Sequence, residues 1–185
     1  TMWRDFSEPY ALALQAETII PDDPELEQIL EAISLHIDVE SDPPGATAYY
    51  KNYNTPEAEW NQAGTTPVRQ LRLPVGIFRW KFELEGHAPV LAAASSWDIN
   101  VGSGSDLLKP SNLFRTLDRI EDLPPGMVRV QGAETPQGFI GDFFIDRFEV
   151  SNAQFQKFVD AGGYSDLELW PKDIWPHLID FKDLT

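Results

Sequence analysis

Apolar residues along the chain follow two periods, and the change between them separates a helical segment from a β segment. Near the start they recur three and four positions apart, at Leu26, Ile29, Leu30 and Ile33. This spacing predicts a helix with one apolar face. Asp23 followed by Pro24 suits the first residues of that helix, and an Ala- and Leu-rich run after Pro9 predicts an earlier one. We therefore expect residues 1–34 to form an N-terminal helical segment.

From residue 35 the apolar positions alternate with polar ones, which is typical of half-buried strands. The clearest case is 78–85, where Phe78, Trp80, Phe82 and Leu84 alternate with charged residues. Further strands are expected at 35–39, 46–53, 68–73, 88–95 and 97–101. Short strands separated by Pro- and Gly-rich turns predict a small antiparallel β-sandwich over residues 35–101, with Trp80 in its core.

The remaining chain divides into a linker and a second folded region. A Gly-Ser run at 102–105 opens an expected linker over 102–123, in which residues 113–122 can lie on either neighbour. Residues 127–130 and 139–148 predict a hairpin around a turn at 132–138. Ser151 and Gln154 then predict a capping box at the start of a helix. The whole chain is therefore expected to be mainly β with helices, an α+β fold.

Composition excludes several functions. The chain has 185 residues, and 14 Lys and Arg against 30 Asp and Glu give a net charge of −16. Nucleic-acid binding is not expected, because phosphate contacts need basic residues. The longest apolar stretch, 90–94, is too short to span a bilayer, so we expect no membrane span in this chain. No cysteine is present, which removes thiol nucleophiles, disulfides and zinc–thiolate sites.

The sequence carries no recognisable catalytic motif. It has no HRD, DFG or G-x-S-x-G run, and its three histidines are far apart. Asp142, Asp146 and Glu149 could bind Ca²⁺, but carboxylates before a helix more often form ion pairs and backbone caps. We expect no catalytic residue, no metal ligand and no cofactor.

Three aromatic residues are the candidate binding site: Tyr49, Tyr53 and Trp60. Alternation places both tyrosines on the face opposite Tyr50, and Trp60 lies in an expected loop at 54–66. If exposed, they suit a protein, peptide or carbohydrate ligand. If buried, they extend the core beneath the loop. Acidic residues on either side of Trp60, at 57 and 59, favour a neutral or cationic partner.

Short motifs in the β segment resemble a PEGA-type module. In order, they are Asp42-Pro43-Pro44-Gly45-Ala46, Thr66-Pro67, Leu73-Pro74-Val75-Gly76 and Glu85-Gly86-His87. Gly45, Gly76 and Gly86 stand where tight turns are expected to need positive φ. The added Tyr and Trp residues resemble the variant found outside the membrane in bacterial eukaryotic-like Ser/Thr kinases.

The C-terminal region, 124–185, resembles the N-terminal part of a formylglycine-generating (sulfatase-modifying factor) domain. The motifs are Pro125-Gly126-Met127-Val128, a run from Phe143 to Asn152, then Phe155, Phe158-Val159 and Gly162-Gly163-Tyr164. The resemblance implies a homologous fragment without the family's copper-binding cysteine pair. A PEGA-like module followed by this domain is similar to the sensory end of membrane-anchored bacterial kinases.

These resemblances imply a non-catalytic extracytoplasmic sensor, recognition or spacer module of a bacterial Ser/Thr kinase-type receptor, on the periplasmic or cell-surface side. The alternative is the N-terminal piece of a formylglycine-generating-type oxidase whose chemistry lies beyond residue 185. The parent protein would be a kinase in the first case. We also expect apolar residues of the C-terminal region to pack on the sandwich or on another copy of the chain, namely Phe143, Phe155, Phe158 and Trp170.

Overall fold

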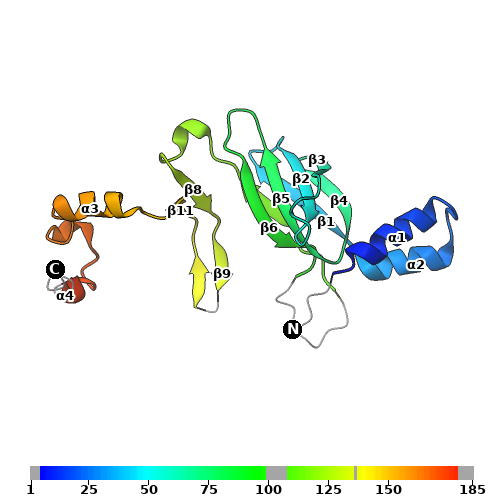
Figure 1. Ribbon diagram of the computed structural model, residues 1–185. Helices are drawn as coiled ribbons and strands as arrows, with labels where there is room; N and C mark the ends of the chain where they lie inside the picture. Colours follow the sequence, from blue (N-terminus) through cyan, green and yellow to red (C-terminus); the bar gives the residue numbers. More distant parts are fainter. Residues whose placement is uncertain (1–4, 99–107, 136, 179–185) are drawn as a thin grey trace. The chain divides into compact units, whose positions relative to one another are not determined.

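The computed structural model describes residues 5–98, 108–135 and 137–178 and contains two compact units (Figure 1). Unit 1 extends to Leu123, and unit 2 begins at Pro124, where the sequence predicts the start of the C-terminal region. Strands and helices occur in both, so the fold is mainly β with helices, as expected for an α+β chain. Each unit is described by itself below.

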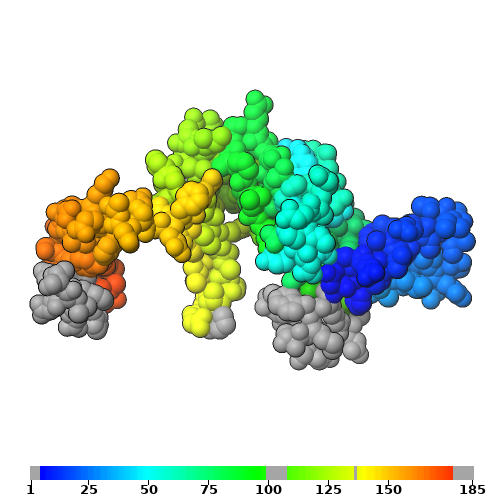
Figure 2. All heavy atoms as spheres, viewed as in Figure 1, coloured from blue at the N-terminus to red at the C-terminus, as the bar shows by residue number. Residues whose placement is uncertain are grey.

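Unit 1 begins with a helical hairpin. Helices α1 (Ser7–Glu17) and α2 (Pro24–Ile33) pack through Ala13, Leu26 and Leu30. The Asp23 side chain accepts hydrogen bonds from the backbone N–H groups of the first turn of α2, at 3.0 and 2.9 Å, which confirms the predicted cap. Figure 2 shows the hairpin, in blue, extending from one end of the sandwich. None of the described helices is long and apolar enough to cross a bilayer.

Two sheets form the sandwich. The first has the order β4-β1-β7, with β4 at Val68–Pro74, β1 at Ser34–Asp42 and β7 at Leu113–Thr116. The second has the order β3-β2-β5-β6, with β3 at Asn61–Thr65, β2 at Thr47–Asn52, β5 at Ile77–Glu83 and β6 at Val90–Ser95. All neighbours are antiparallel except β1 and β7, which run parallel.

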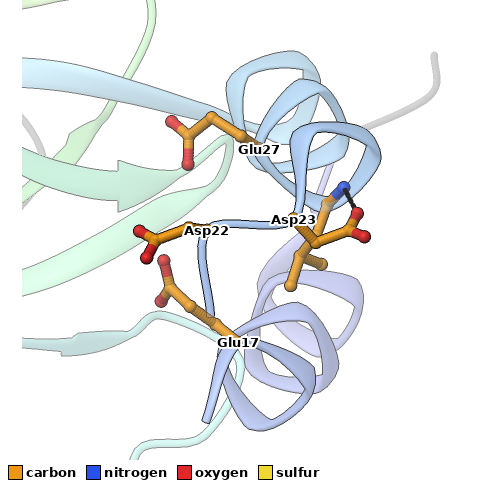
Figure 3. Close-up of a pocket in the computed structure, with 5 residues that line it drawn as sticks. Glu17, Asp22, Asp23 and Glu27 are labelled. Carbon is orange, nitrogen blue, oxygen red and sulfur yellow. Dashed lines mark hydrogen bonds between the residues drawn. The ribbon is translucent and has the colours of Figure 1, made fainter. Parts of the chain in front are cut away.

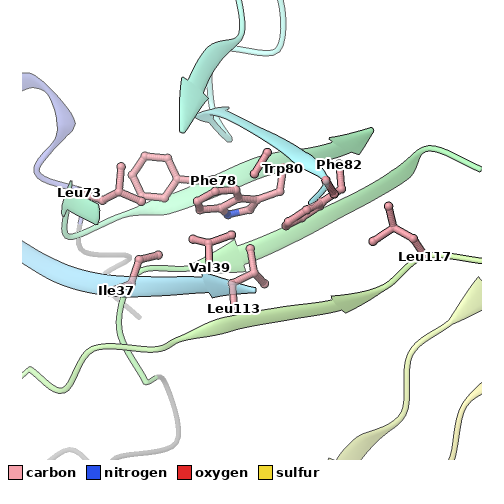
Figure 4. Close-up of a cluster of buried hydrophobic side chains, with 10 residues drawn as sticks. Ile37, Val39, Leu73, Phe78, Trp80, Phe82, Leu113 and Leu117 are labelled. Carbon is pink, nitrogen blue, oxygen red and sulfur yellow. The ribbon is translucent and has the colours of Figure 1, made fainter. Parts of the chain in front are cut away.

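The core lies between the two sheets (Figure 4). Phe78, Trp80 and Phe82 point inward from β5 and face Ile37 and Val39 of β1. Trp80 is only 1% exposed, so the predicted core face of this strand is confirmed. Tyr50 also points inward, with its ring centroid 5.9 Å from that of Phe78 and 5.6 Å from that of Trp80.

The C-terminal part of the predicted linker over 102–123 lies on the sandwich, one of the two neighbours expected for residues 113–122. Residues 113–116 form β7, and Leu113 and Leu117 are buried in the core. Strand β7 lies on the side of β1 opposite β4, and both leucines pack into the core cluster from there. A short η1 helix, Ile120–Asp122, follows. The Gly-Ser run at 102–105 and most of the strand expected at 97–101 lie outside the described residues.

Two smaller expectations in unit 1 also need correction. The loop expected at 54–66 contains β3, a polar edge strand paired with β2, so the connection is only residues 53–60. Of the three glycines expected at positive φ, Gly45 (φ 99°) and Gly86 (φ 75°) have it, but Gly76 does not. At Gly76 the turn instead places its N–H 3.1 Å from the Ser96 hydroxyl oxygen, which accepts a hydrogen bond from it.

Unit 2 is a long hairpin followed by helices. Strand β8 (Met127–Val130) pairs with β11 (Phe143–Asp146), and β9 (Ala133–Thr135) pairs with β10 (Gly138–Ile140). The predicted turn at 132–138 therefore contains β9, and the predicted strand at 139–148 is interrupted. At the interruption the Gly132 N–H donates to Asp142 Oδ1 over 2.8 Å. Helix α3 (Asn152–Asp160), the η2 turn (Leu167–Leu169) and α4 (Trp175–Leu178) follow.

The predicted capping box of α3 is confirmed. Ser151 Oγ accepts from the Gln154 N–H at 3.3 Å, and Gln154 Oε1 accepts from the Ser151 N–H at 2.9 Å. Phe158 and Trp170 are half-buried among the aromatic side chains of unit 2 itself. Phe143 and Phe155 remain 44% and 48% exposed.

Candidate functional site

The three predicted binding residues lie on the outer face of the second sheet, away from the core. Tyr49 belongs to β2, Tyr53 directly follows it, and Trp60 directly precedes β3. Tyr53 is 42% exposed, whereas Tyr49 and Trp60 are half-buried. The sheet register explains the placement, because Tyr50 lies opposite the inward Trp80 and its neighbours along β2 must therefore point outward.

Each of these aromatic rings has a cation over it. Lys81 Nζ lies 4.4 Å from the Tyr49 ring centroid, Lys51 Nζ lies 4.6 Å from that of Trp60, and Arg79 Cζ lies 4.4 Å from that of Tyr53. Such distances are within the range of cation–π attraction. We call the set the aromatic–cation face; its residues are Tyr49, Lys51, Tyr53, Trp60, Arg79 and Lys81.

The cations are functional candidates that the sequence reasoning missed. Arg79 and Lys81 visibly alternate with Phe78, Trp80 and Phe82 in the sequence, but the rings over which the cations lie could not be read from it. The cations also determine the charge of the outward strand positions. The outward positions of β2 and β5 carry three cations and one acid, Glu83, which pairs with Lys81 at 2.9 Å. Positive charge therefore predominates at these strand positions, and the neutral or cationic preference expected from residues 57 and 59 stays a prediction.

The connection between β2 and β3 is fastened to this face. Lys51 Nζ donates hydrogen bonds to the carbonyl oxygens of Pro56 and Ala58, the latter over 3.1 Å. The same ammonium group covers one face of the Trp60 ring. Since cations already occupy the aromatic rings, stacking of a sugar ring is less favoured here than contacts made by charged and polar groups.

A polar cluster holds the start of α1 against the end of β2. Asp5 accepts hydrogen bonds from Asn52 Nδ2 at 3.2 Å and from Asn54 Nδ2 at 3.1 Å, and from the Ser7 N–H at 3.0 Å. Burial alone would raise the pKa of Asp5, but these hydrogen bonds outweigh it and lower the pKa. The cluster anchors the helical hairpin beside the aromatic–cation face.

Of the carboxylates considered for Ca²⁺, Asp142 has a structural role. Asp142 accepts from the Gly132 N–H and from Arg129 Nη1 at 3.0 Å. The Gly132 hydrogen bond contributes most to lowering the pKa of Asp142, and Arg129 adds to it. Within residues 5–98, 108–135 and 137–178, no three His, Asp or Glu side chains gather as a metal ion would require.

A small acidic notch lies between α1 and α2 (Figure 3). Glu17, Asp22 and Glu27 lie on one side of the connection, while Asp23 turns toward the N–H groups of α2. Glu27 also pairs with Arg72 at 3.3 Å. The notch is a solvated turn between helices, and nothing in its geometry indicates a ligand.

Comparison with protein-family models, curated proteins and solved structures gives no match for this chain.

Proposed function

We propose that this chain is a non-catalytic recognition or spacer module from the extracytoplasmic part of a bacterial Ser/Thr kinase-type receptor. The observation that carries the recognition role is the aromatic–cation face. It gathers Tyr49, Tyr53 and Trp60 on one outward sheet face together with three charged side chains. The order of PEGA-like and sulfatase-modifying-factor-like motifs supports the receptor setting.

The surrounding architecture suits such a role. The face is built on β2 and β5, the two central strands of the second sheet, whose inward side chains belong to the core. A rigid sheet holds surface side chains in fixed positions, which reduces the conformational entropy lost when a partner binds.

Site-specific photo-crosslinking in the parent receptor tests the recognition role. A benzophenone side chain placed at Tyr53 is expected to yield a defined crosslinked species in the membrane fraction. The matched control is Ile19 in the α1–α2 connection, which is 78% exposed. Identical products at both positions, or none at Tyr53, would contradict recognition by this face.

The extracytoplasmic location has its own test. Protease added to spheroplasts should cleave this chain in the intact parent without rupture of the cytoplasmic membrane. Cleavage that requires membrane rupture would place the chain in the cytoplasm and reject the receptor setting.

A second candidate function is the N-terminal piece of a formylglycine-generating-type oxidase. The described part of unit 2 favours it, because no hydrophobic side chain there is buried and Phe148 is 80% exposed. Exposed apolar faces of this kind suit the first part of a larger core. The chain itself has no cysteine, so it should not convert a sulfatase-type cysteine peptide. Conversion by the parent protein, read by aldehyde labelling, would favour the oxidase.

A further inference from the structure

We propose that the aromatic–cation face binds a carboxylate-bearing segment of an acidic polypeptide, with Arg79 as the main contact. The inference rests on the proposed recognition function and adds the chemistry of the partner. It is derived from how charge is arranged on β2 and β5.

Two cations face each other across this strand pair. Lys51 of β2 lies directly opposite Arg79 of β5 in the antiparallel register. Like charges in directly opposed positions destabilise a sheet. Lys81 lies two residues further along β5, on the same outward face. The chain has more than twice as many acidic as basic residues, so an uncompensated pair of cations is an unusual arrangement for it.

Four other described cations of unit 1 have carboxylate partners, namely Arg69, Arg72, Lys81 and Arg119, while Arg115 donates to the Phe114 carbonyl oxygen. Arg69 pairs with Asp38 at 2.9 Å and also with Glu40, and Arg119 pairs with Glu121 at 2.5 Å. Within the described part of the chain, Lys51 and Arg79 bond instead to neutral groups. Lys51 donates to loop carbonyl oxygens, and Arg79 Nε donates to the Tyr53 carbonyl oxygen over 3.2 Å.

The position of Arg79 leaves its strongest binding groups available. Its guanidinium plane lies near the Tyr53 ring, and only Nε donates to a described residue. Both terminal nitrogens therefore have no hydrogen-bond partner among the described residues and can donate to a ligand. A guanidinium edge matches the two oxygens of a carboxylate, and charge-assisted bonds of this type are stronger than neutral ones. An incoming carboxylate would also relieve the repulsion between Lys51 and Arg79.

The same observations favour a peptide over other anions. Cations cover the faces of Tyr49 and Trp60, so these rings do not offer the open faces on which acidic sugars would stack. The net charge of −16 repels long polyanions such as nucleic acids. A peptide segment with one or two carboxylates can contact the cations at short range without bringing a large charge density near the acidic hairpin.

Fluorescence anisotropy on the full chain tests the proposal. The probe is a labelled octapeptide of alternating glutamate and serine, with the glutamine–serine peptide as its control. We expect saturable binding of the glutamate peptide only, weakened by added salt. Arg79→Gln should weaken it about tenfold, and Arg79→Lys should weaken it less. Arg69→Gln, on the other sheet, is the matched control and should bind as the unmodified chain does.

Circular dichroism first establishes that each variant is folded, and Lys81→Gln provides a second variant of the same face. Equal affinity for the two peptides, or full affinity in Arg79→Gln, overturns the proposal. Preference for an oligoglucuronate over the glutamate peptide also overturns it. A partner crosslinked at Tyr53 without glutamate-peptide binding would refute this chemistry but leave the recognition function standing. Glutamate-specific binding without any crosslinked partner would support this chemistry but contradict the recognition function.

Discussion

Lys51 lies over Trp60, with its ammonium nitrogen 4.6 Å from the ring centroid, and so connects the end of β2 to the residue before β3. Its hydrogen bonds to the carbonyl oxygens of Pro56 and Ala58 hold the intervening turn. One side chain thus fixes both the backbone of the connection and the aromatic residue at its end.

Replacing Lys51 with Met should release this connection. The variant keeps an apolar stem of similar length but loses the ammonium group that bonds to the loop carbonyls. We expect faster amide hydrogen exchange over residues 54–60 and little change in the core strands. Lys157→Met, in α3 of unit 2, is the control. Unchanged exchange in the loop would mean that Lys51 does not hold it.

Trp80 should be the most sensitive core position. Truncation to Ala removes a large side chain that is 1% exposed and should lower the free energy of unfolding by about 3–5 kcal/mol. Leu91→Ala on β6 is the control, because Leu91 is 72% exposed and exposed substitutions usually change stability by less than about 0.5 kcal/mol. Urea denaturation measures both. Similar losses for the two variants would show that the faces of the second sheet are assigned incorrectly.

The buried hydroxyl of Thr66 should contribute through hydrogen bonds. Thr66 Oγ1 accepts from the Ala46 N–H at 3.0 Å and the Gly45 N–H at 3.1 Å, and it lies 2.6 Å from Ser41 Oγ. Thr66→Val keeps the shape but leaves the buried Ala46 N–H without its acceptor, whereas the Gly45 N–H keeps the Thr66 carbonyl oxygen at 2.9 Å and the Ser41 hydroxyl keeps that of Pro43. The loss should cost about 1–3 kcal/mol.

The neighbouring Thr65 offers a matched control for that substitution. Thr65 is exposed on the edge strand β3, so Thr65→Val should leave the urea midpoint nearly unchanged. An equal effect of the two substitutions would attribute the loss to valine itself rather than to the buried hydroxyl.

Asp38 should make the stability of the folded chain depend on pH in the acidic range. The Gln70 N–H, which donates to Asp38 over 2.9 Å, and the Arg69 guanidinium lower the pKa of Asp38 in the folded chain. A lowered folded-state pKa stabilises the protein above the unfolded pKa of about 4, and this contribution is lost as the pH falls through the folded value. Asp38→Asn should therefore flatten part of the decline in urea midpoint below about pH 4.

Carbon-13 NMR of the Asp38 carboxyl group measures its pKa directly. Arg69→Gln should move that pKa toward its ordinary value, because the cation that stabilises the carboxylate is removed. A titration of Asp38 at the ordinary value in the unmodified chain would contradict the assignment.

Local patterns were sufficient for elements whose signal lies within one segment. The alternation around Trp80 predicted β5, the Asp23–Pro24 pair predicted the start of α2, and Ser151 with Gln154 predicted the cap of α3. By contrast, β7 has only four residues and pairs in parallel with β1, more than seventy positions earlier. No local period indicates a partner at that distance, so residues 113–116 were placed in the linker, with packing on either neighbour left open.

The candidate site was likewise predictable from the sequence only in part. Alternation alone placed Tyr49 and Tyr53 on the face opposite Tyr50, and the structure has them there. The cations were not predicted because their relation to the rings depends on the register between β2 and β5. That register places Lys81 opposite Tyr49 and Arg79 opposite Lys51. The acidic residues at 57 and 59 are close to Trp60 in sequence, but the cations that contact the rings come from β2 and β5, so the charge of the partner stays a prediction.

The parallel pairing of β1 and β7 has a mechanical consequence. Strand β1 follows the helical hairpin directly, and β7 is the last strand before unit 2, so tension along the chain pulls the two strands in opposite directions along their length. In this shear geometry the hydrogen bonds between Val39–Asp42 and Leu113–Thr116 are loaded together, whereas a hairpin pulled from its open end loses its bonds singly. A chain held at both ends would thus transmit force through unit 1 before the sandwich opened.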